Sequence, residues 1–201
     1  MNRKGDQPEA MNCLETIRKR RSVRDYKDQS VSDKELFQIL EAGRQAPSAG
    51  NRQPWRFILI KNRETIEEVA DTTYVGADSG SQQHQDWFRS APVVITVCTD
   101  NRKTVARYGE MGKEAALQDT AAAVENMLLA VNALGLGSCW IGGFRGEELR
   151  KMLKIPQNVE PAALLPIGYS KDTSPGRTRK NMEEILFYEE YGRHSTGENF
   201  S

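Results

Sequence analysis

The residues best suited to chemistry are cations clustered near the start of the chain. Lys and Arg occupy positions 18–21, and Ser22 and Arg24 follow them. Arginine side chains bind phosphate through paired hydrogen bonds, and a serine hydroxyl can add a further donor. The cluster therefore predicts an anion-binding site, although a solvated basic helix end explains the same residues.

A second polar segment, residues 46–55 (APSAGNRQPW), has the composition of an irregular loop. Gly50 and two prolines restrict its backbone, while Ser48 and Asn51 offer hydrogen bonds. Such a loop can hold the edge of a planar polar heterocycle. A capped surface loop would have the same composition, so both interpretations stay open.

A third segment, residues 135–144 (GLGSCWIGGF), contains a pair of adjacent glycines. Because Gly142 and Gly143 lack a Cβ, their backbone N–H groups can approach a ligand closely. A sharp turn would need the same residues. Far downstream, Arg177 and Arg179 form a second basic patch, for which a solvated loop is the simplest explanation.

Several common catalytic devices are absent from the sequence. His84 and His194 are the only histidines, and no Cys, His or acidic cluster has the spacing of metal ligands. The sequence also lacks GxSxG, GxGxxG and Walker motifs. An enzyme with this sequence would therefore need a bound cofactor for the difficult step.

Composition narrows the class of protein further. The 201 residues include 28 basic and 28 acidic side chains, so the formal net charge is zero. We expect no nucleic-acid partner, because such a protein needs a basic surplus. Three separated cysteines and the polar start of the chain favour a cytoplasmic protein. The apolar segment 121–134 contains Glu125 and two asparagines, so we expect no membrane span.

Hydrophobic periodicity predicts a mixture of helices and strands. The predicted helices are residues 9–21, 33–44, 113–134 and 147–153, and the predicted strands are residues 55–61, 92–99, 138–141 and 162–169. Ser32 and Glu35 predict a capping box, and Val31 and Leu36 a hydrophobic staple.

Three of the predicted segments have special features. The continuous apolar run 92–99 predicts a strand covered on both faces. The helix 113–134 is apolar nearly all round, which predicts burial on several sides, with a second subunit as one source of cover. Residues 71–84 are polar and without period, and we expect a lid there.

Taken in order, these segments resemble the FMN-dependent nitroreductase family. The resemblance rests on RRSVRDY at residues 20–26, the loop at 46–55, the glycine segment at 135–144, PIGY at 166–169 and the two C-terminal arginines. It implies an α+β fold, a three-layer α/β/α sandwich whose mixed, mainly antiparallel sheet is flanked by helices. The implied assembly is an intertwined homodimer with FMN at its interface. One domain over residues 1–201 is expected, with a core at about 10–192 and an arm at 181–201 wrapping the partner.

The resemblance also implies an activity, that of an NAD(P)H-dependent flavin oxidoreductase. Hydride would pass from NAD(P)H through flavin N5 to a small-molecule acceptor such as a nitroaromatic, a quinone or an enone, in a ping-pong cycle. Alternatives on the same scaffold are dehalogenation, flavin cleavage, ring dehydrogenation and flavin binding without catalysis. A basic binding module without flavin is a further alternative.

Positions that match the family's motifs are implied to bind FMN, and no side chain is implied to be catalytic. The implied set is Arg20, Arg21, Ser22, Arg24, Pro47, Ser48, Ala49, Asn51, Ile141, Gly142, Gly143, Arg177 and Arg179. Arg20 and Ser22 would hold the phosphate, with Arg177 and Arg179 completing its cage. Arg21 would add backbone or side-chain contacts, and Arg24 would approach the N1/O2 edge. The 47–51 loop would come from the neighbouring subunit, and the glycines would face N5. One of Gln82, Gln83 and Gln85 is implied to contact the flavin edge, with its register open.

Overall fold

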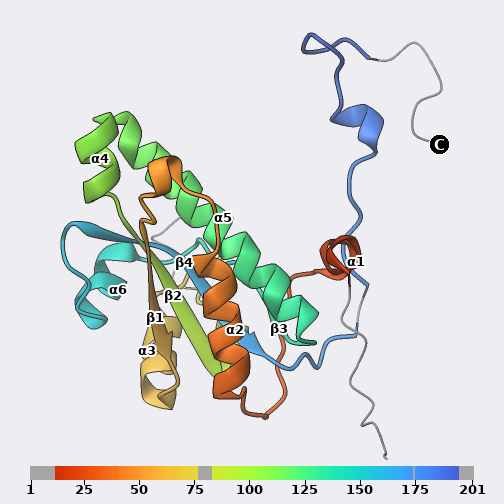
Figure 1. Cartoon of the computed structure of the whole chain (residues 1–201). Coiled ribbons are helices and arrows are strands. Elements are labelled where there is room, and N and C mark those ends of the chain that lie inside the picture. The colour runs from red at the N-terminus through yellow and green to blue at the C-terminus, as the bar shows by residue number, and fades with distance from the viewer. Residues whose placement is uncertain (1–11, 77–82, 174, 195–201) are drawn as a thin grey trace, which may run out of the picture.

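A four-stranded sheet lies between two layers of helices (Figure 1). Its strands are, in spatial order, β1 (Trp55–Ile60), β2 (Val93–Asp100), β4 (Val159–Gly168) and β3 (Gly137–Ser138). The computed structural model describes residues 12–76, 83–173 and 175–194, and the three strand pairings in these ranges are antiparallel. An isolated parallel bridge joins Ser22 to Ser138 outside these pairings, so the described sheet agrees with the mainly antiparallel sheet that the resemblance implies.

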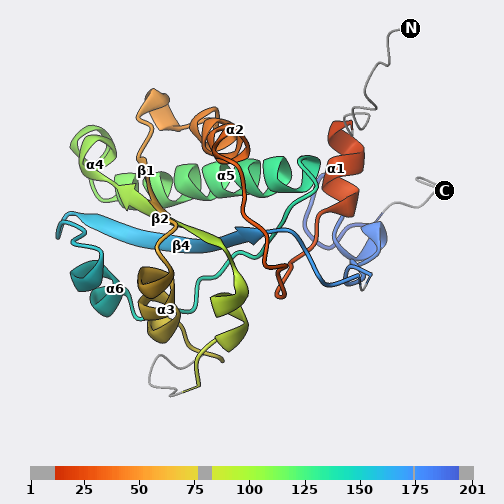
Figure 2. The same cartoon turned by 90° about the horizontal axis from the view of Figure 1, so that it is seen from below.

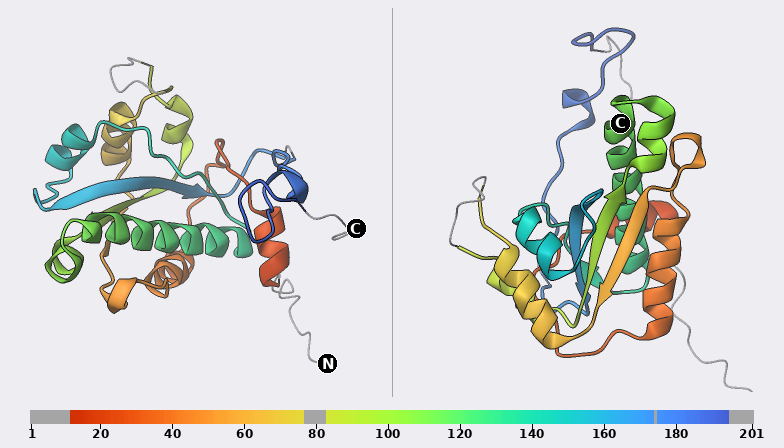
Figure 3. Two further views of the ribbon diagram at one scale, coloured as in Figure 1. Left: turned by 90° about the horizontal axis from the view of Figure 1, so that it is seen from above. Right: turned by 90° about the vertical axis from the view of Figure 1, so that its left-hand side faces the viewer.

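The helices divide between the two faces of the sheet (Figures 2 and 3). On one face lie α2 (Asp33–Arg44), α4 (Arg102–Tyr108) and α5 (Met111–Ala133), and on the other lie α3 (Arg63–Thr72), α6 (Gly146–Met152) and the short turn η2 (Asp86–Ser90). The helix α1 (Cys13–Lys19) contacts α5 at one end of the molecule. The predicted α+β, three-layer α/β/α architecture is confirmed.

The strand β2 is the centre of the core. All eight of its residues are buried, and successive side chains point to opposite faces of the sheet. Ile95 packs in the cluster formed with α2 and α5, whereas Val94 packs in the cluster formed with α3 and α6. The prediction of a strand covered on both faces is therefore confirmed.

The start of α2 follows its predicted local chemistry. Ser32 Oγ accepts a hydrogen bond from the Glu35 backbone N–H at 3.3 Å, and Glu35 Oε2 accepts one from the Ser32 backbone N–H at 2.8 Å. Val31 and Leu36 are buried in the same apolar cluster. The capping box and the hydrophobic staple are both confirmed, and α2 has the predicted bounds.

The long helix α5 is less buried in the subunit than its composition predicts. Ala116, Ala123 and Met127 are fully buried, and Met127 belongs to the apolar cluster that α5 forms with α2 and the sheet. Leu117 is 55% exposed, and Met111 is 80% exposed. The described chain thus covers only part of this helix, and the predicted burial by a second subunit stays a prediction.

Several predicted boundaries need correction. The first helix ends at Lys19 rather than at residue 21, because the next residues are extended and Val23 donates to the Ser138 carbonyl. β3 covers Gly137–Ser138 alone, and Ile141 forms an isolated bridge to Leu164. The helices α3 and α4 were not predicted from the sequence.

The segment 71–84, where a lid is predicted, begins with the last residues of α3. Residues 77–82 of this segment lie outside the described residues.

After β4 the chain leaves the body of the subunit (Figure 1). The segment 175–194 contains only the short turn η3 (Met182–Glu184), and Tyr191 is 94% exposed. Residues 195–201 of the expected arm, residues 1–11 and Gln82 lie outside the described residues. Within the described ranges, no helix has both the length and the apolar character that crossing a membrane requires.

Candidate functional site

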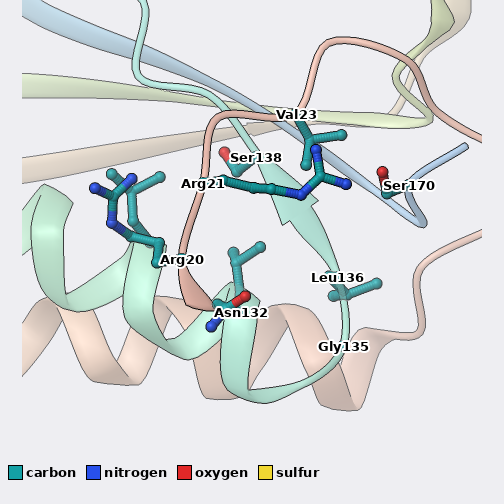
Figure 4. Close-up of a pocket in the computed structure, with 10 residues that line it drawn as sticks. Arg20, Arg21, Val23, Asn132, Gly135, Leu136, Ser138 and Ser170 are labelled. Atoms are coloured by element: carbon teal, nitrogen blue, oxygen red, sulfur yellow. The ribbon is translucent and has the colours of Figure 1, made fainter. Parts of the chain in front are cut away.

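The basic cluster lines a pocket of about 260 Å³ (Figure 4). The pocket lies where the segment after α1, the C-terminal end of α5, and β3 meet. Its lining residues are Arg20, Arg21, Val23, Leu128, Val131, Asn132, Gly135, Leu136, Ser138 and Ser170. Two arginines and several apolar side chains thus line the same pocket. Such a pocket can bind an anion that carries an organic chain.

Close backbone approach builds this pocket. Val23 donates its backbone N–H to the Ser138 carbonyl at 2.9 Å, which lays the basic segment beside β3. A Cβ placed on Gly137 would come within 2.7 Å of Val23 Cγ2, so a glycine is needed for this contact. Two of the singled-out segments, 18–24 and 135–144, are therefore neighbours in the fold.

The pocket-lining arginines are each paired with a carboxylate. Arg20 Nε lies 3.3 Å from Glu125 Oε1 of α5, and Arg21 Nη1 lies 2.7 Å from Asp172 Oδ2. Arg21 Nη2 also donates to the Asp172 backbone carbonyl. The two guanidinium groups are thereby oriented, and part of their charge is offset.

One polar atom of the pocket has no partner within the described structure. Ser138 Oγ is buried and makes no hydrogen bond there. A buried hydroxyl without a partner is unfavourable, so a ligand or water that donates to or accepts from it would be stabilised. The adjacent Cys139 is also buried, and its burial raises the pKa of the thiol, which keeps it neutral.

The glycine pair lies beyond β3, beside a short polar segment. Tyr74 donates its backbone N–H to the Gly143 carbonyl at 3.1 Å, and Gln85 Nε2 donates to the Tyr74 carbonyl at 3.1 Å. Ile141 is buried, whereas Gly142 is exposed and a Cβ there would meet no atom within 4 Å. Of the three glutamines left open, Gln85 is the one shown beside this open backbone.

Arg24 points to a different neighbour from the other cations. Its guanidinium carbon lies 5.7 Å from the centroid of the Trp87 ring, a cation–π distance. Trp87 belongs to η2 and packs against buried Val23 and Tyr26. The sequence analysis did not single out Trp87, because an aromatic residue in a turn carries no signal of a cationic partner.

The loop at 46–55 lies far from this pocket within one subunit. Both carboxylate oxygens of Asp119 accept from the Ala49 backbone N–H at 3.1 Å, which fixes the loop on the N-terminal half of α5. Burial raises the pKa of Asp119, and the Ala49 hydrogen bond opposes that shift. Since Leu128 and Asn132 line the pocket, the loop's anchor at Asp119 and the pocket are about 13 to 20 Å apart along the helix.

The remaining predicted residues are placed around these two regions. Pro47, Ser48 and Asn51 belong to the loop, and Ser22 is exposed between Arg21 and Val23. A Cβ on Gly176 would lie 3.6 Å from Arg21 Cβ, so the downstream chain passes the pocket. Arg177 and Arg179 follow it, exposed, with Arg179 Nη1 donating to the Arg177 carbonyl at 2.8 Å. In one subunit they do not line the pocket.

Fold and site together define a class of protein. The model of the nitroreductase family matches residues 17–169, and the chain belongs to this family. It is accordingly an oxidoreductase.

Among its relatives is a protein of Archaeoglobus fulgidus named for NADH dehydrogenase or NAD(P)H nitroreductase activity. It is 37% identical over 164 residues, which are 80% of this chain and 86% of that protein. An FMN reductase [NAD(P)H] of Bacillus subtilis is 30% identical over 192 residues, with 89% and 74% coverage. The crystal structure of a nitroreductase family protein of Clostridium difficile 630 matches with a TM-score of 0.76 and 32% identity, covering 90% of this chain and 99% of that one.

Proposed function

We propose that the protein is an FMN-dependent NAD(P)H oxidoreductase that acts as a homodimer on a small acceptor such as a nitroaromatic, a quinone or an enone. The observation that carries this proposal is the pocket at Arg20 and Arg21, joined through β3 to the open backbone at Gly142. The names of the relatives from Archaeoglobus fulgidus and Bacillus subtilis support the same donor and cofactor.

The residues present fit the phosphate end of FMN. Arg20 supplies a guanidinium at the mouth of the pocket, and the partnerless Ser138 hydroxyl offers a hydrogen bond inside it. Leu128 and Leu136 supply an apolar wall for the carbon chain. When bound, FMN supplies a ring nitrogen that accepts hydride from the nucleotide and donates it to the acceptor.

The protein's own groups bind and orient rather than form bonds. The Gly142 and Gly143 backbone presents a wall without side chains, against which a planar ring can lie. Arg24, oriented by Trp87, supplies positive charge that favours the anionic reduced state of a nearby ring. Arg177 and Arg179 complete the phosphate cage in this proposal.

The loop at 46–55 serves the site of the partner subunit in this proposal. α5 places the loop about 13 Å or more from the pocket of the same chain, and in this proposal a cofactor in the pocket contacts the loop of the partner subunit instead. Phe37 of α2 and Leu117 of α5 are 68% and 55% exposed, which supplies apolar surface for such an interface. Pro47, Ser48, Ala49 and Asn51 would then cover the partner's flavin.

An absorbance spectrum tests the proposal directly. We expect the purified protein, loaded with FMN, to show flavin bands that bleach under anaerobic NADPH or NADH and return when a quinone is added. Bands that resist both nucleotides would favour dehalogenation, flavin cleavage or binding without catalysis. A protein that takes up no FMN would contradict the proposal.

The phosphate assignment has its own test, the variant Arg20→Ala. Loss of a hydrogen bond to a charged group weakens binding by about tenfold or more, so we expect FMN affinity to fall by that factor. The matched control is Lys19→Ala, whose side chain pairs with Glu15 on the surface of α1. Equal FMN affinity in both variants would remove Arg20 from the site.

A further inference from the structure

The cations of the pocket are held by acidic groups that would compete with a bound phosphate. Glu125 lies 3.3 Å from Arg20 Nε, and Asp172 lies 2.7 Å from Arg21 Nη1. An incoming phosphate meets these guanidinium groups together with the carboxylates that already attract them. The pocket is therefore less positive than its arginines alone suggest.

The two ion pairs differ in strength. Arg21 is tied twice, to the carboxylate and to the backbone carbonyl of Asp172, so it fastens the chain after β4. Arg20 has the longer ion pair, and the Glu125 side chain is 47% exposed, against 31% for Asp172. Arg20 can consequently turn from its partner to a ligand at smaller cost than Arg21 can.

Glu125 is also placed at the edge of the pocket by the helix itself. Residues three and seven positions further along α5, Leu128 and Asn132, line the pocket, and residues at these spacings share one helix face. The carboxylate thus acts on the pocket in two ways. It occupies a donor of Arg20, and it repels a phosphate dianion nearby.

We propose that Glu125 sets the affinity for the flavin phosphate, holding FMN loosely enough to exchange with free FMN. This inference rests on the proposed function, because it takes FMN as the ligand. It makes Glu125 a residue that acts through Arg20, with no contact to the reacting atoms. Its replacement by glutamine removes the charge and nearly preserves the shape.

The test compares FMN with riboflavin, which has the same ring and carbon chain without the phosphate. The dissociation constants of both are measured by fluorescence quenching for the unaltered protein and for Glu125→Gln. We expect FMN to bind about threefold more tightly to the variant, as for loss of a partly exposed ion pair, with riboflavin unchanged. At FMN concentrations well below its dissociation constant, inorganic phosphate should also compete at a lower concentration in the variant.

A control separates the pocket from the general charge of the helix. Glu114→Gln removes an exposed carboxylate near the start of α5, and we expect it to change neither constant. Melting curves of each variant check that the fold is kept.

The possible outcomes distinguish the two proposals. FMN affinity that is unchanged or weaker in Glu125→Gln overturns the inference, as does an equal gain for riboflavin. If the unaltered protein binds no FMN, the proposed function fails and the inference falls with it. If FMN binds and bleaches with NADPH while Glu125→Gln behaves like the unaltered protein, the inference alone fails.

Discussion

At the scale of single residues, a substitution of Gly142 can distinguish an effect on stability from an effect on the rate of reduction. An added Cβ would meet no atom within 4 Å, so the fold has room for a side chain there. A methyl group would nevertheless project from the surface against which we propose the flavin ring lies. Packing within the described structure therefore does not require a glycine at position 142, and we propose that the ring does.

We accordingly expect Gly142→Ala to leave stability within about 0.5 kcal/mol of the parent. Reduction by NADPH should slow about tenfold or more, because a small displacement of reacting groups has large kinetic effects. Stopped-flow bleaching and thermal melting measure the two quantities. Gly146→Ala, which also adds a methyl group in open space, is the matched control and should change neither. An unaltered reduction rate in Gly142→Ala would place the ring elsewhere.

At the scale of elements, the start of α2 depends on one carboxylate. Glu35 accepts hydrogen bonds from Ser32 N–H and from the Tyr169 hydroxyl at 2.9 Å, joining the helix to the residue that follows β4. Burial raises the pKa of this carboxyl, but the hydrogen bonds from Ser32 and Tyr169 outweigh burial and leave its pKa below the ordinary value.

The lowered pKa predicts an acid-dependent contribution to stability. The ionised Glu35 carboxylate contributes its whole share of stability at a pH above the pKa of Glu in the unfolded chain. This share is lost as the pH falls through the lower pKa that Glu35 has in the folded protein. We expect Glu35→Gln to unfold about 1 kcal/mol more easily at pH 7, and the difference from the parent to shrink at pH 3. Urea unfolding at both pH values measures it, with the exposed Glu68→Gln as control. A difference that persists at pH 3 would show that shape rather than charge matters.

Prediction from sequence succeeded where local chemistry decides the structure. The cap at Ser32 and the apolar run of β2 specify their elements without distant partners. It found β4 but placed its start at residue 162 instead of Val159, because Pro161 argues against a strand until the irregular register opposite Cys98 is known. It failed for α3, whose N-cap Asn62 was a readable signal.

In the candidate site too, local sequence patterns predicted some residues, and contacts between distant segments determine the others. The cations of the pocket were found from their sequence, but their partners Glu125 and Asp172 come from distant segments. Neither partner has a neighbouring residue that marks it as part of a site. Such pairings depend on the tertiary fold and leave no local pattern.

At the scale of the whole molecule, the C-terminal segment lies away from the body of its own subunit (Figure 1). Met182 and Ile185 are 55% and 56% exposed, which is unfavourable for apolar side chains in water. Contact with a partner subunit would bury them.

Truncation before Met182 should therefore weaken the homodimer that we propose. Sedimentation at a series of concentrations measures the monomer–dimer equilibrium, and we expect dissociation at concentrations where the full chain stays dimeric. The paired substitution Met182→Gln with Ile185→Gln keeps the chain length and should act in the same direction. An undisturbed dimer in both cases would contradict the arm's role.

The length of α5 between loop and pocket has a genetic consequence. If each complete site draws its pocket from one subunit and its loop from the other, two proteins with different defects in FMN binding can complement each other. Coexpressing Arg20→Ala with a chain whose 47–51 loop is replaced by glycines would form mixed dimers in which one site carries both defects and the other carries none. Tight FMN binding would reappear at one site of each mixed dimer although neither parent binds FMN tightly, whereas sites contained within single subunits would all keep their weakened binding.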